Sequence, residues 1–277
     1  MFFSQKILLR LIILCSHCSN KLNSVNKVTT RFMHNIMTAR SSLEALNERS
    51  ATVFLVLLLC VDLAFFGMHF IAAIIGDIKW VLKSDLFNIE LDRGYPEIYQ
   101  YIKFSWIIVL LFNLSLKNRS LHYIPWVLLF TYFLLDDSIQ IYEQAGYFFT
   151  ELFNFTPLFG LRVQDYGELA FTATAGILLL PPLVWAYRKG TQIFRKISLD
   201  IGLLVLVLVF FGVVVDMVHI VVPLGTVSFI VGVVEDGGEM LAVSLILWYN
   251  FLLNVRGVNA GYYLCDFVRI TSTRRYT

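Results

Sequence analysis

The stretch "VSFIVGVVEDGGEMLAVSLILWYNFLL", residues 227–253, is an apolar run interrupted by three acids and a pair of glycines. At about 1.5 Å per residue, a helix of this length crosses the roughly 30 Å hydrocarbon core of a bilayer. Its apolar residues do not alternate with polar ones, as they would in a strand of a membrane barrel. The run therefore predicts a transmembrane helix that carries Glu235, Asp236 and Glu239.

The composition of the whole chain favours the same class of protein. Of the 277 residues, 58% are hydrophobic and only 15% are charged, which is more apolar surface than one soluble core can bury. The apolar runs, of which the second is short, lie at residues 51–76, 102–116, 123–148, 169–187, 199–222 and 227–253. We expect an all-α fold, a polytopic integral membrane helix bundle of about six transmembrane helices.

The distribution of charge indicates the orientation. The formal net charge is only +2, and no basic stripe alternates with aromatic residues, so nucleic-acid binding is not expected. Lys and Arg concentrate in the first fifty residues, in the connections at 117–119 and 188–196, and in the tail, whereas acids outnumber them at 77–97. By the positive-inside rule the basic segments and both termini are cytoplasmic. The expected partner is a lipid bilayer, and the choice of membrane stays open.

Three parts of the chain are expected: a basic N-terminal segment at residues 1–50, a six-helix transmembrane domain at 51–255 and a basic cytoplasmic tail at 256–277. The first segment fits a targeting peptide, an interfacial amphipathic helix, or a disordered extension upstream of a start at Met37 instead of Met1. Its Cys15-Ser-His-Cys18 motif has no second Cys pair. We therefore expect two ordinary thiols rather than a zinc site.

Ionisable residues recur at one depth of the predicted spans. Spans that rise from the cytoplasmic side carry their acids late, and spans that descend carry them early, so each group lies mid-membrane or nearer the outer face. Five helices contribute Asp62, His69, Asp136, Asp137, Glu143, Asp165, Glu168, Asp216, His219, Glu235, Asp236 and Glu239. We expect one buried polar site in the outer half of the bundle.

Spacing along the helices supports a common site, because residues three, four or seven apart share a helix face. Such pairs are Asp62 with His69, Asp136 with Glu143, Asp165 with Glu168, Asp216 with His219, and Glu235 or Asp236 with Glu239. Gly237 and Gly238 are expected to let another helix backbone approach at this level, with Gly212 and Gly232 in a similar role.

The acids in these spans need compensation. A carboxylate that faces lipid at a helix centre costs about 3 kcal/mol, and the whole set would cost on the order of 10 to 30 kcal/mol. Lys103 and Arg162, near the outer ends of their spans, are the only nearby cations. We therefore expect protons, bound metal ions, cavity water or the imidazoles of His69 and His219 to compensate the charge.

Simpler roles stay open for some of these residues. Asp165 and Glu168 fit first-turn acids that complement a helix dipole. Glu143 fits interfacial water, and Asp62 with His69 fits one satisfied polar pair. For the other acids a functional role is favoured, because ionisable residues inside a membrane usually serve function.

The pattern predicts a multi-pass membrane protein that binds or transports a cation, either a divalent metal or a proton. The residues expected to bind it are those of the set above except Asp165 and Glu168. A divalent metal, of unknown identity, would be held by Asp136, Asp216, His219, Asp236 and Glu239. The acids of the outer connection, Glu90, Asp92 and Glu97, are expected to tolerate alanine.

Two other classes stay open. A metal-dependent membrane enzyme acting on a lipid or quinone-like substrate would use carboxylate and His ligands at i, i+3 spacing, and only Asp216 and His219 form such a pair. A structural subunit of a membrane complex, or a homo-oligomer, would use the polar residues to fix helix packing. The sequence has no P-loop, no Gly-x-Ser-x-Gly motif and no Gly-rich dinucleotide motif, so no catalytic residue is assigned.

Overall fold

The computed structural model describes residues 47–71, 85–153, 162–222 and 225–258. The chain divides into two units, Met1–Arg49 and Ser50–Thr277. Every contact given below lies within the second unit. The segment with Cys15 and Cys18, the alternative starts and most of the basic tail lie outside the described residues.

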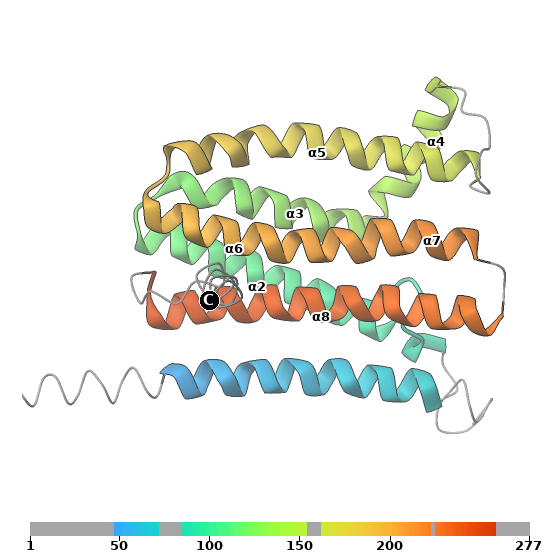
Figure 1. Ribbon diagram of the computed structural model, residues 1–277, viewed down its shortest axis with the longest axis horizontal. Helices are drawn as coiled ribbons and strands as arrows, with labels where there is room; N and C mark the ends of the chain where they lie inside the picture. Colours follow the sequence, from blue (N-terminus) through green and yellow to red (C-terminus); the bar gives the residue numbers. More distant parts are fainter. Residues whose placement is uncertain (1–46, 72–84, 154–161, 223–224, 259–277) are drawn as a thin grey trace, which may run out of the picture. The chain divides into compact units, whose positions relative to one another are not determined.

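The described residues contain no strand, which confirms the all-α class. In chain order (Figure 1) the elements are a first helix Asn47–Ile71, the 3-10 turn η1 Asp85–Phe87, α2 Tyr95–Lys117, the 3-10 turn η2 Leu121–Tyr123, α3 Ile124–Ile139, α4 Ile141–Phe153, α5 Val163–Lys189, α6 Gln192–Val209, the π-helical segment η3 Phe210–Val215, α7 Asp216–Val221 and α8 Thr226–Arg256.

Four of these helices are long and apolar enough to cross a membrane: the first helix, α2, α5, and the continuous run Gln192–Val221 formed by α6, η3 and α7. The bent pair Leu121–Ile139 and Gln144–Phe153 makes a fifth if both halves belong to one span. α8 carries three acids and falls outside this set, although its 31 residues extend over roughly 46 Å. Length and composition therefore support four to five of the six predicted spans.

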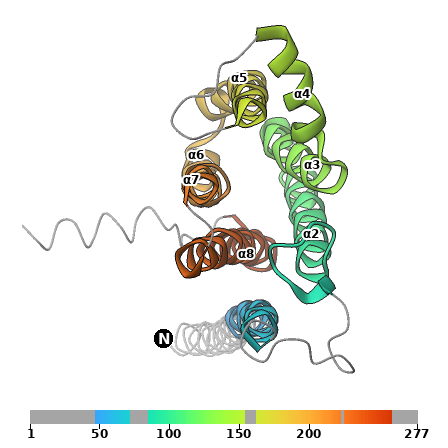
Figure 2. The ribbon, with the colours of Figure 1, turned by 90° about the vertical axis from the view of Figure 1, so that its right-hand side faces the viewer.

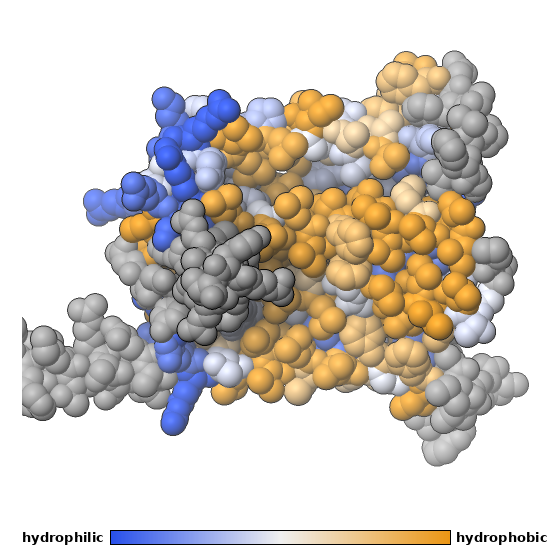
Figure 3. Space-filling model, in the orientation of Figure 1, coloured by the Kyte–Doolittle hydropathy of each residue, from blue (hydrophilic) through white to orange (hydrophobic). Residues whose placement is uncertain are grey.

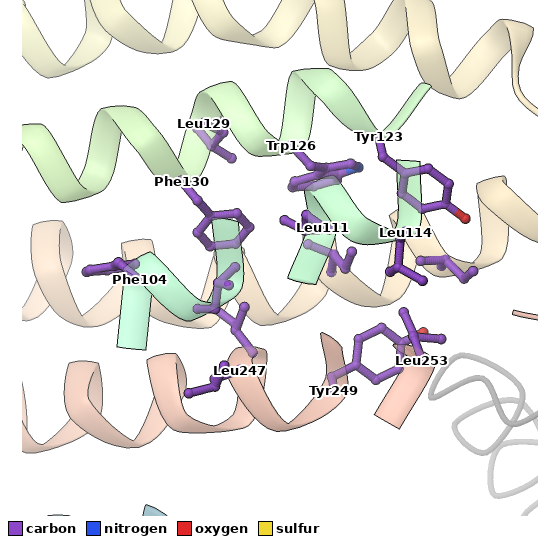
Figure 4. Packing of buried hydrophobic residues seen from close by; sticks show 14 of the residues in the cluster. Phe104, Leu111, Leu114, Tyr123, Trp126, Leu129, Phe130, Leu247, Tyr249 and Leu253 are labelled. Atoms are coloured by element: carbon purple, nitrogen blue, oxygen red, sulfur yellow. The ribbon is translucent and has the colours of Figure 1, made fainter. Parts of the chain in front are cut away.

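α8 links several of the helices. It contacts α2, α6, η3 and α7, while α3 contacts α2 and α5, and α4 contacts α5. Viewed end-on, α2, α3, α5, α6 and α8 surround a common centre (Figure 2). The first helix packs on α8, where the ring centroids of Phe54 and Phe251 lie 4.5 Å apart. The apolar core (Figure 4) joins α2, α3 and α8 through Phe104, Leu111, Trp126, Phe130 and Leu247.

The two ends of these helices differ in charge. Near one end Lys117 donates a hydrogen bond to the carbonyl oxygen of Asn254 at 3.3 Å, and His122 stacks on Trp185. Figure 3 shows hydrophilic residues gathered there, where α5 ends and α6 begins. We call this the basic end, and the opposite end, where α7 leads into α8, the acidic end. The two internal basic connections therefore lie on one side, as predicted.

The predicted span at residues 123–148 does not form one straight helix. α3 ends at Ile139, Gln140 follows in the left-handed region with φ 55°, and the pair bends by 93°. The Gln140 amide donates to Asp92 at 3.1 Å, and its side-chain oxygen accepts from Arg93 at 3.3 Å. A positive φ is unfavourable for a residue other than glycine, so these two contacts help to hold the break in place.

Candidate functional site

The predicted polar residues separate into two groups. The first joins the first helix, α2 and α8 through Asp62, Lys103 and Ser244, and we call it the paired group. The second lies nearer the acidic end and joins α3, η3, α7 and α8; we call it the acidic cluster. Its members are Asp137, Asp216, His219, Glu235, Asp236 and Glu239.

The paired group is a buried and internally neutralised ion pair. The Nζ atom of Lys103 lies 3.1 Å from Oδ1 of Asp62 and donates to the Met240 carbonyl oxygen at 2.9 Å and to Ser244 Oγ at 3.2 Å. Ser244 donates to the second oxygen of Asp62 at 2.6 Å, and the Tyr99 ring lies 4.6 Å from the ammonium. The side chains of Asp62 and Lys103 are 0% and 1% exposed. All three ammonium protons have acceptors, so the group is suited to hold the first helix on α2 and α8.

His69 does not pair with Asp62. Its imidazole stacks on Phe229 of α8 with ring centroids 5.2 Å apart. The side chain is 6% exposed, and its Nε2 has no hydrogen-bond partner among the described residues. Asp62 is satisfied by Lys103 and Ser244 instead, so the expected Asp62–His69 pair is not formed.

On α7 and α8 the acidic cluster forms a hydrogen-bonded chain. Nδ1 of His219 lies 2.6 Å from Oε2 of Glu235, and Nε2 lies 3.2 Å from Ser228 Oγ. The carboxyl of Asp216, one turn before His219, is an electrostatic neighbour of the carboxyl of Glu235. Two carboxyl groups can share a hydrogen bond only when one of them carries a proton. The chain is therefore an arrangement that can hold protons.

Glu239 extends the cluster one turn along α8. The carboxyls of Asp137 on α3, of Asp236 and of Asp216 are its electrostatic neighbours. It lies against Gly212 of η3, where an added Cβ would collide with Oε1 of Glu239. The six residues of η3 form a π-helical segment, an irregularity that is frequent at functional sites. Gly212 thus makes room for a carboxyl beside this segment.

The connection between η1 and α2 brings in two acids that helix spacing did not indicate. A Cβ on Gly232 would lie 2.6 Å from Oε1 of Glu90 and 2.9 Å from Cε1 of His219, so Glu90 reaches the cluster. Asp92 is, like Glu90, an electrostatic neighbour of Asp236. Both Glu90 and Asp92 are exposed. They form the solvent-facing rim of the cluster, outside any helix whose periodicity would reveal them.

Two further acids lie near the break in α3. Oδ1 of Asp136 accepts a hydrogen bond from the backbone N–H of Tyr142 at 3.0 Å. This contact joins the two halves of the bent pair, so Asp136 has a local structural role. The side chain of Glu143 lies outside what the structure describes.

The acids at the start of α5 act locally. Asp165 accepts hydrogen bonds from the Arg162 backbone N–H at 2.7 Å and from its guanidinium at 2.8 Å, within a capping box. The same hydrogen bonds and charge raise the pKa of the Arg162 guanidinium. Glu168 accepts from the Gln164 amide at 2.7 Å. Asp165 therefore lies in the first turn of α5, as the first-turn interpretation expected.

The glycines of α8 admit aromatic side chains rather than a helix backbone. A Cβ on Gly237 would lie 2.6 Å from the ring of Phe66 on the first helix, and a Cβ on Gly238 would collide with the ring of Phe211 on η3. The expected approach of another helix backbone is therefore wrong at Gly237 and Gly238, where aromatic rings fill the space.

The acidic cluster carries excess negative charge. No described Lys or Arg forms an ion pair with Asp137, Asp216, Asp236 or Glu239, all of which are partly buried. Within the described ranges, no three His, Cys, Asp or Glu side chains are arranged to hold one metal ion. In the observed geometry the cluster can thus bind protons directly, whereas a metal ion would require the side chains to close around it.

One buried acid lies in the other half of the helices. Asp200 on α6 is 0% exposed and accepts a hydrogen bond from the Tyr249 hydroxyl at 2.6 Å. Asp200 lies one helical turn after Lys196, in the half of α6 that is nearer the basic end. The expectation that all acids gather toward the outer face therefore does not hold for Asp200.

Comparison with known proteins places the chain in a family. Residues 93–255, from just before α2 to the last turn of α8, match the family described as "Domain of unknown function (DUF8692)". The match covers more than half of the chain. The chain belongs to the DUF8692 family. No curated protein and no solved structure matches it. The DUF8692 region includes Lys103 and the whole acidic cluster, whereas Asp62 and Glu90 precede it.

Proposed function

We propose that the protein is a multi-pass membrane protein of about six spans whose basic end and both termini face the cytoplasm. The apolar helices support a membrane location, and so do large apolar side chains on their outer faces, such as Leu178 at 69% and Leu206 at 66% exposure. The basic end supports the orientation through the positive-inside rule.

The segment η3–α7 illustrates how a span accommodates acids. On one side, residues from Val213 to Val222 line an open apolar groove of about 500 Å³. On the other side, Asp216 and His219 contact α8. This division suits a helix with one face in lipid and one face in a polar interior.

We further propose that the acidic cluster binds a cation from the outer side, and that protons fit its geometry best. The single observation that carries this proposal is the contact of the His219 imidazole with Glu235 at 2.6 Å, with the carboxyl of Asp216 as a further neighbour of Glu235. Neighbouring carboxyl and imidazole groups of this kind can hold a proton between two acceptors. Chains of Asp, Glu and His serve as proton relays in membrane pumps and transporters.

A divalent metal ion is the second candidate occupant. Carboxylate oxygens are the preferred ligands of hard cations such as Ca²⁺, Mg²⁺ and Mn²⁺, and Asp137, Asp236 and Glu239 lie near one another. In this case the residues of α3 and α8 would move together on binding.

Elemental analysis separates the two candidates. Detergent-purified wild-type protein and an Asp216→Asn, Glu239→Gln variant are analysed by inductively coupled plasma mass spectrometry, with Glu151→Gln on the exposed side of α4 as a control. Near-stoichiometric metal that is lost only in the double variant would assign a metal site, and iron or zinc would favour an enzyme over a carrier. We expect no bound metal in any sample, a result that favours protons as the occupant of the acidic cluster.

A further inference from the structure

Gln100 on α2 carries a buried hydrogen-bond acceptor without a partner. Its side chain is 7% exposed, and its Oε1 meets no donor among the described residues. A buried acceptor without a partner costs on the order of 1 to 3 kcal/mol. This cost is absent in any state of the protein in which Oε1 accepts a hydrogen bond.

Two neighbours on the same face of α2 show which way Gln100 points. Lys103 lies three residues later and contacts the Met240 carbonyl oxygen on α8. Phe104 lies four residues later and packs on Phe133 of α3, with ring centroids 6.2 Å apart. Residues three and four apart share a helix face, so Gln100 faces the space between α8 and α3.

The helix register places Gln100 level with the acidic cluster. α2 and α8 run parallel, because Lys103 meets Met240 near the middle and Asn113 meets Asn254 near the basic end. One turn from Lys103 toward the acidic end of α2 therefore corresponds to residues 236–239 of α8, which include Asp236 and Glu239.

The register of α2 against α3 also places Gln100 at the level of the acidic cluster. The hydroxyl of Tyr101, the residue after Gln100, donates a hydrogen bond to the backbone carbonyl of Asp137 at 3.2 Å. Asp137 is in turn an electrostatic neighbour of Glu239. Contacts of Tyr101 and Lys103 thus place Gln100 at the level of the acidic cluster.

We propose that Gln100 is a positioning residue of the proton site and that its amide oxygen accepts a hydrogen bond from the protonated carboxyl of Glu239. This inference rests on the proposed function. An amide oxygen and a carboxylate are both acceptors, so they form a hydrogen bond only when the carboxyl holds its proton. When the proton leaves for a neighbouring carboxylate, the bond is lost and Oε1 is left unpaired. Gln100 therefore stabilises the proton-loaded state.

Charged groups reach this place from every element that packs around it. They are Glu97 and Lys103 on α2, Asp137 on α3, Asp216 on α7, Asp236 and Glu239 on α8, and Glu90 and Asp92 in the connection before α2. The ammonium of Lys103 is already bound by Asp62, Ser244 and Met240. It does not replace the proton at the cluster.

The test follows the infrared band of protonated carboxyl groups while the pH is titrated. Gln100→Leu removes the acceptor and keeps an apolar side chain of similar size. Asn250→Leu is the matched control: Asn250 on α8 also has a buried, unpaired amide oxygen, but it lies three turns from Glu239 toward the basic end. Both variants relieve an unpaired acceptor, so both are expected to fold.

The account predicts that Gln100→Leu lowers the proton affinity of the cluster about tenfold, the equivalent of one hydrogen bond, and shifts the titration of the band to lower pH. Asn250→Leu leaves the titration in place. An unshifted titration in Gln100→Leu, or an equal shift in both variants, would overturn the role of Gln100. A wild-type protein without any titrating carboxyl band would instead overturn the proposed proton site itself.

Discussion

The paired group and the acidic cluster both hold acidic side chains and meet at neighbouring levels of α8, yet their charges are balanced in opposite ways. Asp62 is matched by the ammonium of Lys103 and the hydroxyl of Ser244. Asp137, Asp216, Asp236 and Glu239 have no described Lys or Arg as ion-pair partner. A buried acid with an internal counter-ion stabilises a fold, whereas a buried acid without one needs an exchangeable cation.

The largest expected effect comes from breaking the paired group. Lys103→Met leaves Asp62 as an unpaired buried charge, and removing one partner of a buried ion pair costs about 3 to 5 kcal/mol of folding free energy. Denaturation of the detergent-solubilised protein measures the loss. The double variant Asp62→Leu, Lys103→Met is expected to recover most of it, because neither charge remains. A stable Lys103→Met single variant would contradict the assignment of the ion pair.

Neutralising the acidic cluster is expected to affect cation binding instead of stability. The Asp216→Asn, Glu239→Gln variant loses two carboxyls of the acidic cluster, and we expect proton or cation affinity to fall by about a hundredfold, about tenfold for each lost carboxyl. The free energy of unfolding is expected to stay level or to rise, because excess negative charge is removed. Equal loss of stability in this variant and in Lys103→Met would erase the distinction between the groups.

The rim acids should have a smaller effect that depends on salt. Glu90→Gln with Asp92→Asn removes two exposed charges near the cluster entrance. We expect the variant to bind cations a few-fold more slowly than the wild type at low ionic strength, and this difference to disappear at high salt. Binding rates measured over a salt series give the result. Glu97, which lies on α2, serves for comparison, and a salt-independent effect would argue against steering by the rim.

The smallest expected effect lies at the start of α5. Arg162→Ala removes a guanidinium that is 69% exposed, so the ion pair with Asp165 contributes about 0 to 1 kcal/mol. Its backbone N–H still bonds Asp165. Unfolding measurements should show little change, and cation binding none. A marked loss of binding would bring Asp165 back into the functional site.

Much of this arrangement could be predicted from sequence. Apolar runs gave the helices, and the spacing of Asp216, His219, Glu235 and Glu239 indicated the face on which α7 and α8 meet. Charge counts gave the separation of a basic end from an acidic end. These features are local, since each depends on the periodicity or composition of one segment.

Other features depend on contacts between distant residues. Lys103 lies in an apolar run, where a cation needs an acidic partner. That partner, Asp62, lies 41 residues away, and no periodic pattern reveals a pairing over this distance. The break at Gln140 follows from side-chain contacts with Asp92 and Arg93. Glu90 reaches the cluster from a connection, and Asp200 is bound by the hydroxyl of Tyr249, 49 residues away. None of these contacts has a signature in a single sequence.

The most direct test measures proton flux into liposomes that contain the purified protein, with an internal pH-sensitive dye and an imposed pH difference. The account predicts flux through the wild-type protein, loss of flux in Asp216→Asn, Glu239→Gln, and retained flux in Asp62→Leu, Lys103→Met. Absence of flux in the wild type, or unchanged flux when the acidic cluster is neutralised, would contradict the claim that this cluster handles protons.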